Sequence, residues 1–247
     1  MTPYTAAARA AWGMWRRDAA LLWPLFGLTQ LLPILMRLLA LPPLPQLGAD
    51  AADTVDRLRA LGDYGRANLP LILAILLMQT LGRATLFCLY RAPPGRTLGT
   101  ALGEAALLLP RYLLVALVVT LGTTLGLLLF WLPGLYLAGR LILVGPVLVA
   151  RPDRPALSAL VESWRLTRGH GLMLMALVAL AELSRALIER PFAFGRALLP
   201  GPSEDSVLDA LLALAQSGVV AAILLALALF QAALYRELAG ERARGSE

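Results

Sequence analysis

Long apolar runs alternate with shorter polar segments along most of the chain. A helix needs about 20 apolar residues to cross a hydrocarbon core of about 30 Å, and each run approaches or exceeds this length. We therefore predict transmembrane helices at residues 19–41, 69–90, 112–132, 134–150, 171–188 and 207–235. Together they predict a single membrane domain over residues 1–240, followed by a cytoplasmic tail over residues 241–247.

Prolines and a glycine mark two places where the apolar runs depart from plain helices. Pro133 cannot continue the third helix and Gly134 accepts turn geometry, so the third and fourth helices are expected to form a tight hairpin. Pro24 and Pro33 lie inside the first run. Because proline interrupts the helical hydrogen-bond ladder, the first run is the candidate for a broken helix.

A short amphipathic segment precedes each pair of apolar runs, at residues 5–18, 97–110 and 155–169. In the last segment Leu157, Val161 and Trp164 fall on one face, as expected for a helix that lies in the membrane interface. The recurrence indicates an internal repeat. The predicted fold is all-α: an integral membrane bundle of six transmembrane helices in three hairpins, each preceded by a cytoplasmic interfacial amphipathic helix.

The composition is that of a membrane protein, with 59% hydrophobic and 15% charged residues. The formal net charge is +6, and all 22 basic residues are arginines. Most of them lie in segments that are cytoplasmic if the N-terminus is cytoplasmic, and basic residues concentrate in cytoplasmic loops. We therefore expect both termini in the cytoplasm. The basic segments contain no nucleic-acid-binding module, so no nucleic acid partner is expected.

Catalytic and metal-binding motifs are absent from the sequence. The single cysteine, Cys88, excludes a disulfide within the chain, and the single histidine, His170, excludes most histidine-based metal sites. The chain contains neither a His-Glu-x-x-His motif nor a Gly-x-Ser-x-Gly elbow nor a phosphate-binding loop. We therefore expect no catalytic residue, no metal and no cofactor.

Four polar residues inside the predicted spans form a candidate site. An arginine near the centre of a span costs about 2.5–3.5 kcal/mol on insertion scales, so each one needs a physical reason. Arg83 and Gln79 are one turn apart, while Arg140 and Glu182 are both expected about 9 Å from the outer end of their helices. We predict an intramembrane polar pocket of these four residues, with an Arg140–Glu182 ion pair. The alternative is that Glu182 pairs with Arg185 on its own helix.

Further arginines are candidates for contact with lipid headgroups. Arg16 and Arg17 lie at the end of the first amphipathic segment, and Arg165 and Arg168 lie in the third. On the cytoplasmic side, arginines near the membrane surface attract anionic lipids. Anionic membrane lipids are therefore the expected partners, with a membrane protein partner or a second copy of the chain as further possibilities.

The segment over residues 131–170 carries a family resemblance. Its distinguishing residues are Pro133, Gly134, Tyr136, Arg140, Pro146, Ser163, Trp164, Leu166, Thr167 and Gly169. In these residues it resembles the bacterial YciC family and the related membrane domain found beside glycerophosphoryl diester phosphodiesterases. The resemblance implies a multi-pass protein of the bacterial inner membrane with six spans. It does not imply phosphodiesterase activity, because no hydrophilic region here is long enough for that catalytic domain.

Three functions are compatible with these observations. The first is a non-enzymatic inner-membrane protein that interacts with lipids or membrane partners. The alternative is a small transporter or channel for an anionic or amphiphilic solute, whose route would be lined by Arg83, Arg140 and Glu182 and interrupted by discontinuous spans. The third is a lipid-modifying membrane enzyme, which would need a cluster of carboxylates or hydroxyls at headgroup level that the sequence does not display. An interior sealed around the charges would exclude transport.

Overall fold

A computed structural model describes residues 3–42, 54–91, 97–197 and 206–244. All regular secondary structure in these ranges is helical. The elements are α1 (Pro3–Phe26), the π-helical turn η1 (Gly27–Leu31), α2 (Leu32–Ala40), α3 (Thr54–Ala67), α4 (Leu69–Tyr90), α5 (Leu98–Leu129), α6 (Trp131–Arg140), α7 (Val144–Ala150), α8 (Ser158–Leu166), α9 (Gly171–Ala197) and α10 (Ser206–Arg244).

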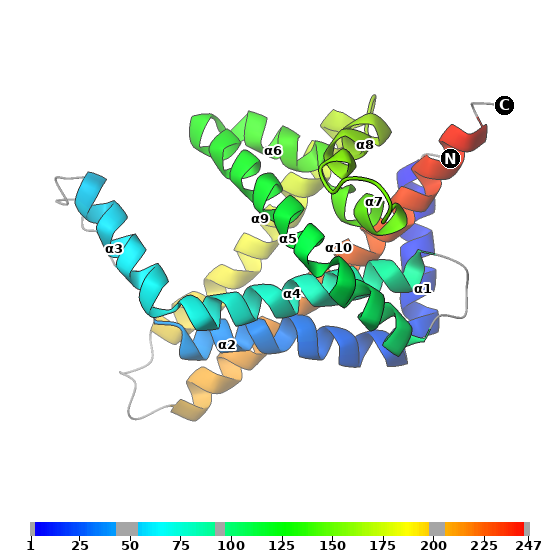
Figure 1. The fold of residues 1–247 in the computed structure, drawn as a ribbon. Helices are drawn as coiled ribbons and strands as arrows, with labels where there is room; N and C mark the ends of the chain where they lie inside the picture. Colours follow the sequence, from blue (N-terminus) through cyan, green and yellow to red (C-terminus); the bar gives the residue numbers. More distant parts are fainter. Residues whose placement is uncertain (1–2, 43–53, 92–96, 198–205, 245–247) are drawn as a thin grey trace.

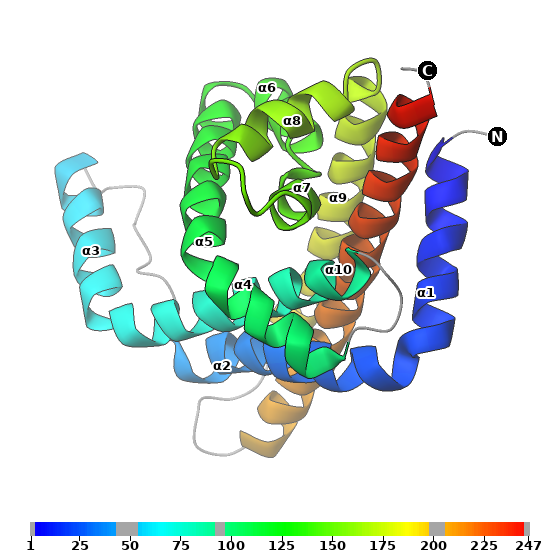
Figure 2. The same cartoon turned by 45° about the vertical axis from the view of Figure 1, so that its right-hand side comes forward.

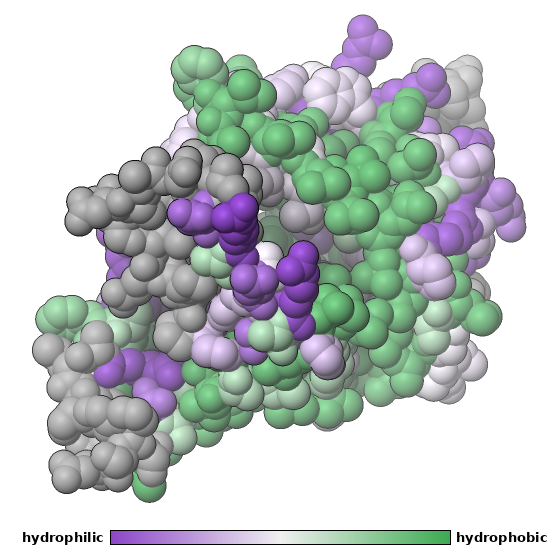
Figure 3. All heavy atoms as spheres, turned by 60° about the vertical axis from the view of Figure 1, so that its left-hand side comes forward, coloured by the Kyte–Doolittle hydropathy of each residue, from purple (hydrophilic) through white to green (hydrophobic). Residues whose placement is uncertain are grey.

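Within the described ranges, six helical stretches are long and apolar enough to cross a membrane. They are Pro3–Ala40, Leu69–Tyr90, Leu98–Leu129, Trp131–Ala150, Gly171–Arg196 and Val207–Gly240. Large apolar side chains remain exposed along them, and Figure 3 shows a broad hydrophobic area on one face, with hydrophilic side chains at its edges and around a central hollow. Such an exposed apolar surface is consistent with a multi-pass membrane protein.

Most helices pack against the membrane-length helices that precede and follow them in the sequence. α4 packs against α5, α5 against α6, and α6 against α9, while α10 packs against both α9 and α1. The start of α1 and the end of α10 lie close together on one side of the molecule in both views (Figures 1 and 2). Leu22 and Phe26 of α1, Leu86 of α4 and Leu234 of α10 are among the largest fully buried side chains, so the core joins the two ends of the chain.

Two of the six stretches are not continuous α-helices. In the first, the Leu32 N–H donates to the Gly27 carbonyl, five residues earlier. Pro33 has no N–H and its ring would meet the carbonyl four residues before it, so a widened turn relieves the clash. The predicted break in the first run is thus a π-helical turn. The second interruption, between α6 and α7 at residues 141–143, was not predicted.

The connection between α5 and α6 differs from the predicted hairpin turn. The turn residue is Phe130, whose backbone is extended, and Gly134 lies inside α6 instead. Pro133 occupies the first turn of α6, where a helix needs no N–H donor. A Cβ on Gly134 would lie 2.4 Å from the Leu127 nitrogen, so this glycine is needed for close packing of α5 on α6 and not for the turn.

The three amphipathic segments share a pattern of burial. Each buries residues at spacing i, i+4 and i+7: Ala7, Ala11 and Met14 in α1; Ala101, Ala105 and Leu108 in α5; and Ala159, Ser163 and Leu166 in α8. Each also exposes a large apolar residue, with Trp12 59%, Leu107 83% and Val161 55% exposed. One face of each segment therefore packs on the bundle, and another apolar face remains uncovered by the protein.

Two segments outside the predicted spans are more helical than expected. α3 lies between the first and second predicted spans, where Arg59 pairs with Asp56 at 3.4 Å and Arg66 with Asp63 at 3.2 Å, each three residues apart. It extends away from the other helices in Figures 1 and 2. α10 continues to Arg244, into the predicted tail, and residues 245–247 lie outside the described ranges.

Candidate functional site

Arg140 is the last residue of α6 and stands at the break before α7. Helical hydrogen bonding fails here: the Val144 N–H donates to the Leu141 carbonyl, which leaves the Arg140 carbonyl without its usual partner from the next turn. Two hydroxyls from the α8 segment replace it, because Ser163 Oγ donates to the Arg140 carbonyl at 2.9 Å and Thr167 Oγ1 at 3.2 Å. The side chains of this segment therefore satisfy the backbone of the interrupted span.

The Arg140 guanidinium is enclosed on the same side. Its Nη1 donates to the Thr167 carbonyl. Its central carbon lies 4.3 Å from the centre of the Trp164 ring and 5.9 Å from that of Tyr136. The residue is 4% exposed, and no carboxylate in the described ranges pairs with it. Aromatic faces and a carbonyl thus hold the cation in place of an ion pair.

Close backbone approach fixes this cluster against α9. A Cβ on Gly171 would lie 2.8 Å from Cε2 of Tyr136 and 3.1 Å from Cδ of Arg140. A Cβ on Gly139 would lie 2.6 Å from the Met175 nitrogen. Gly169, just before α9, has φ of +86°, which favours glycine. These contacts form a packed cluster in which Arg140, Ser163 and Thr167 are buried and Trp164 covers the guanidinium from the outer side.

The predicted Arg140–Glu182 ion pair is wrong. Glu182 Oε2 instead accepts from Arg185 Nη2 at 2.7 Å, and Arg185 Nη1 also reaches Glu189 Oε1 at 3.2 Å. This is the alternative that placed the partner on the same helix. Equal depth predicted the pair only for a continuous fourth helix, and the break after Arg140 instead places its side chain against the α8 segment.

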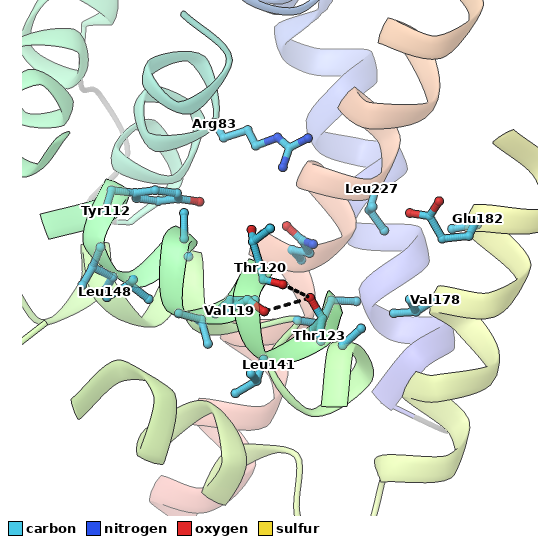
Figure 4. Close-up of a pocket in the computed structure, with 18 residues that line it drawn as sticks. Arg83, Tyr112, Val119, Thr120, Thr123, Leu141, Leu148, Val178, Glu182 and Leu227 are labelled. Carbon is cyan, nitrogen blue, oxygen red and sulfur yellow. Dashed lines mark hydrogen bonds between the residues drawn. The ribbon is translucent and has the colours of Figure 1, made fainter. Parts of the chain in front are cut away.

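A cavity of about 420 Å³ lies between α4, α5, the α6–α7 region, α9 and α10. Its wall is largely apolar, and Val178 and Leu227 are examples of its lining. The polar lining residues are Arg83, Tyr112, Thr120, Thr123, Glu182 and Gln231. Figure 4 shows Arg83 entering from α4 and Glu182 from α9, on opposite sides of the space. This volume falls within the range of small-molecule sites.

Arg83 is half-buried in this cavity and makes no hydrogen bond or ion pair with any residue that the structure describes. Thr123, by contrast, donates to the Val119 carbonyl at 2.8 Å and so satisfies its own hydroxyl. The cavity therefore offers a cation whose donors are unused. A guanidinium presents five N–H donors in a fixed fork, a geometry that suits carboxylate or phosphate oxygens.

The four residues of the predicted polar pocket are thus divided. Arg83 and Glu182 line one cavity, whereas Arg140 is sealed in the separate cluster. The Gln79 side chain does not line the cavity, and its backbone carbonyl accepts from Gln30 Nε2 at 2.9 Å.

Sequence reasoning missed Tyr112, Thr120, Thr123 and Gln231 as cavity residues. A signal was present, since each is a polar side chain within a predicted apolar run.

The four arginines expected at headgroups are all exposed: Arg16, Arg17, Arg165 and Arg168. Arg17 is engaged locally, since its Nη2 lies 3.2 Å from Asp18 Oδ2, which also accepts from the Tyr90 hydroxyl at 2.7 Å. Arg16 forms no ion pair within the described ranges. Their contact with lipid stays a prediction.

Comparison with known proteins identifies no relative that would assign a function to this cavity. Among the described residues, histidines, cysteines and carboxylates form no group of three or more that could hold a metal ion. The chain matches no family model, no curated protein and no solved structure.

Proposed function

We propose that this chain is a non-enzymatic membrane protein that binds a lipid-like amphiphile in the cavity between α5, α9 and α10. Arg83 would hold the anionic group of the ligand, and the apolar wall would accept part of an acyl chain. The observation that carries the proposal is the Arg83 guanidinium, which lines the cavity without any partner among the described residues.

Energetic reasoning favours a bound anion at this position. Arg83 lies in α4, one of the six membrane-crossing stretches, and a cation there costs about 2.5–3.5 kcal/mol near the centre of a span. At Arg140 the protein offsets this cost with aromatic rings and a carbonyl. At Arg83 the described residues provide no such group, so an anionic ligand or water has to supply it.

The proposed arrangement in the membrane follows from the amphipathic segments. Their uncovered apolar faces would lie in the cytoplasmic interface, and each would lead into one helical hairpin. Arg16, Arg17, Arg165 and Arg168 would then meet anionic headgroups. With the resemblance to the YciC family, this supports a place in a bacterial inner membrane, with both termini in the cytoplasm and room for a membrane partner or a second copy.

Lipid retention by the purified protein tests the proposal. After extensive exchange into a nonionic detergent, bound phospholipid is counted by native mass spectrometry for wild type, Arg83→Gln and Arg37→Gln. Arg37 is an exposed arginine of α2 and serves as the matched control. We expect wild type and Arg37→Gln to retain about one phospholipid and Arg83→Gln to lose it. Equal retention by all three, or none by wild type, would overturn the proposal.

Transport of the same amphiphile is a second candidate, favoured by the two interrupted spans. Discontinuous helices beside a central site are a feature of many transporters, and here η1 and the α6–α7 break interrupt two of the six stretches. Proteoliposomes with a fluorescent phospholipid in one leaflet provide the test. Transport predicts faster lipid exchange between the leaflets with wild type than with Arg83→Gln. If wild type exchanges lipid no faster than protein-free vesicles do, the protein binds the amphiphile without transporting it.

A further inference from the structure

The anionic side of the cavity carries a net charge even though Glu182 is paired. Arg185 is shared by two carboxylates, Glu182 at 2.7 Å and Glu189 at 3.2 Å. One guanidinium between two carboxylates leaves one negative charge uncompensated within this cluster. Of the three side chains, Glu182 is the one that lines the cavity. The α9 wall therefore presents negative charge to any occupant.

The opposite wall presents positive charge, and the two do not neutralise each other. Arg83 extends from α4 and Glu182 from α9 into the same space (Figure 4), and no ion pair joins them within the described ranges. A purely anionic occupant would satisfy Arg83 but place a second negative charge near Glu182. A purely cationic occupant would do the reverse. Either arrangement leaves one charge of the cavity uncompensated.

We infer that the cavity selects a zwitterionic phospholipid with a primary ammonium group. Its phosphate binds Arg83, its ammonium binds Glu182, and part of an acyl chain lies against the apolar wall formed in part by Val178 and Leu227. The Gln231 amide and the Thr120 hydroxyl, which also line the cavity, supply neutral hydrogen bonds to the headgroup. This inference rests on the proposed function, which requires only that Arg83 hold an anionic group.

Headgroup competition tests the inference. The full-length protein in nonionic detergent micelles is offered equal amounts of phosphatidylethanolamine and phosphatidylglycerol with matched acyl chains, and both bound species are counted by native mass spectrometry. We expect wild type to favour phosphatidylethanolamine about tenfold, which corresponds to about 1.4 kcal/mol. Phosphatidylcholine, whose quaternary ammonium has no N–H donor, should bind less well than phosphatidylethanolamine.

Two carboxylate variants give a matched comparison. Glu182→Gln removes the charge that lines the cavity, whereas Glu189→Gln removes the other carboxylate bound to Arg185, outside the lining. We expect the preference to disappear in Glu182→Gln, which leaves no carboxylate on the cavity wall, and to fall less in Glu189→Gln, which keeps that carboxylate but leaves it neutralised by Arg185. Glu182 is 55% exposed at its side chain, so this substitution is not expected to impair folding.

The outcomes separate the two proposals. If wild type binds both lipids equally, or if Glu182→Gln keeps the wild-type preference, the zwitterion inference is wrong. The proposed function would still hold provided that Arg83→Gln loses both lipids. Retention of both lipids by Arg83→Gln would overturn both. Displacement of bound lipid by soluble glycerophosphoethanolamine at equal concentration would refute the role assigned to the acyl chain.

Discussion

Arg140 and Arg83 are both arginines within stretches that are long and apolar enough to cross a membrane, yet their surroundings are opposite. Arg140 stacks on Trp164, donates to the Thr167 carbonyl and is 4% exposed. Arg83 projects into a cavity and has no partner among the described residues. One cation completes the fold and the other is left available.

The two surroundings indicate different roles for the two arginines, one in stability and one in ligand binding. Around Arg140 the Ser163 and Thr167 hydroxyls both donate to the interrupted backbone, and the guanidinium lies against aromatic rings and donates to a carbonyl, so its removal would disturb a buried cluster. Around Arg83 the described residues form no such network, so its removal should leave the fold largely intact. Stability and ligand binding should therefore separate between the two sites.

Replacing each arginine in turn should give the largest difference in the free energy of unfolding between the two sites. Arg140→Met loses a charged hydrogen bond, worth about 1.5–3 kcal/mol, and a cation–π contact of about 1–2 kcal/mol. We expect it to lower the free energy of unfolding by about 2–4 kcal/mol, and Arg83→Met to change it by less than about 1 kcal/mol. Helix content followed by circular dichroism during denaturant titration in detergent micelles measures both. Equal destabilisation would contradict the comparison.

Adding a methyl group beside each site should have the next largest effect. In Gly139→Ala the new Cβ would meet backbone atoms of α9, the nearest at 2.6 Å, and these cannot move aside. In Gly145→Ala it would meet two side chains, Tyr112 Oη of the cavity lining at 2.5 Å and the ring of the buried Phe87 at 2.7 Å.

We expect Gly139→Ala to cost about 1–3 kcal/mol, as overpacking usually does, and Gly145→Ala to cost less because the atoms it meets belong to side chains, which shift more readily than the backbone of α9. The same denaturant titration compares them. A larger loss in Gly145→Ala would show that the cavity wall is the more rigid of the two regions.

Removal of the hydroxyls that satisfy the Arg140 carbonyl should have a smaller and non-additive effect. Either Ser163→Ala or Thr167→Val alone leaves one donor to the carbonyl, so each should cost about 1 kcal/mol or less. The double variant leaves the carbonyl without a donor and should cost more than the sum of the single variants. Additive losses would show that the carbonyl finds another partner, such as water.

The sequence predicted the helices better than the partnerships between them. Apolar run lengths located the six helical stretches that are long and apolar enough to cross a membrane, because hydrocarbon thickness sets a length that each run meets separately. The break after Arg140 has no comparable local signal. Pro146 lies in the first turn of α7, where a proline fits a helix start as well as it marks an interruption.

The partners of Arg140 and Glu182 depend on the break between α6 and α7. Depth along an assumed continuous helix predicted Glu182 as the partner of Arg140, but the interrupted backbone and the hydroxyls of the α8 segment decide the outcome. Spacing along one helix correctly gave Arg185 as the alternative partner of Glu182, because a contact three residues apart needs no tertiary information. A cavity, by contrast, is a property of several helices together and cannot be read from any one of them.

Chemical access should differ between the two sites even where stability hardly changes. Thr120→Cys places a thiol in the cavity, and Ser163→Cys places one in the sealed cluster, where the native side chain is 0% exposed. The native Cys88 is also 0% exposed, so background labelling should be slow. We expect a small methanethiosulfonate reagent to modify Thr120→Cys quickly in detergent and Ser163→Cys only after denaturation, with labelling followed by intact-protein mass spectrometry. Bound phospholipid should slow the first reaction and leave the second unchanged, since only the first thiol shares its space with the ligand. Equal labelling rates at the two positions would mean that Arg140 is no better sealed than Arg83, and the division of roles between these arginines would fail.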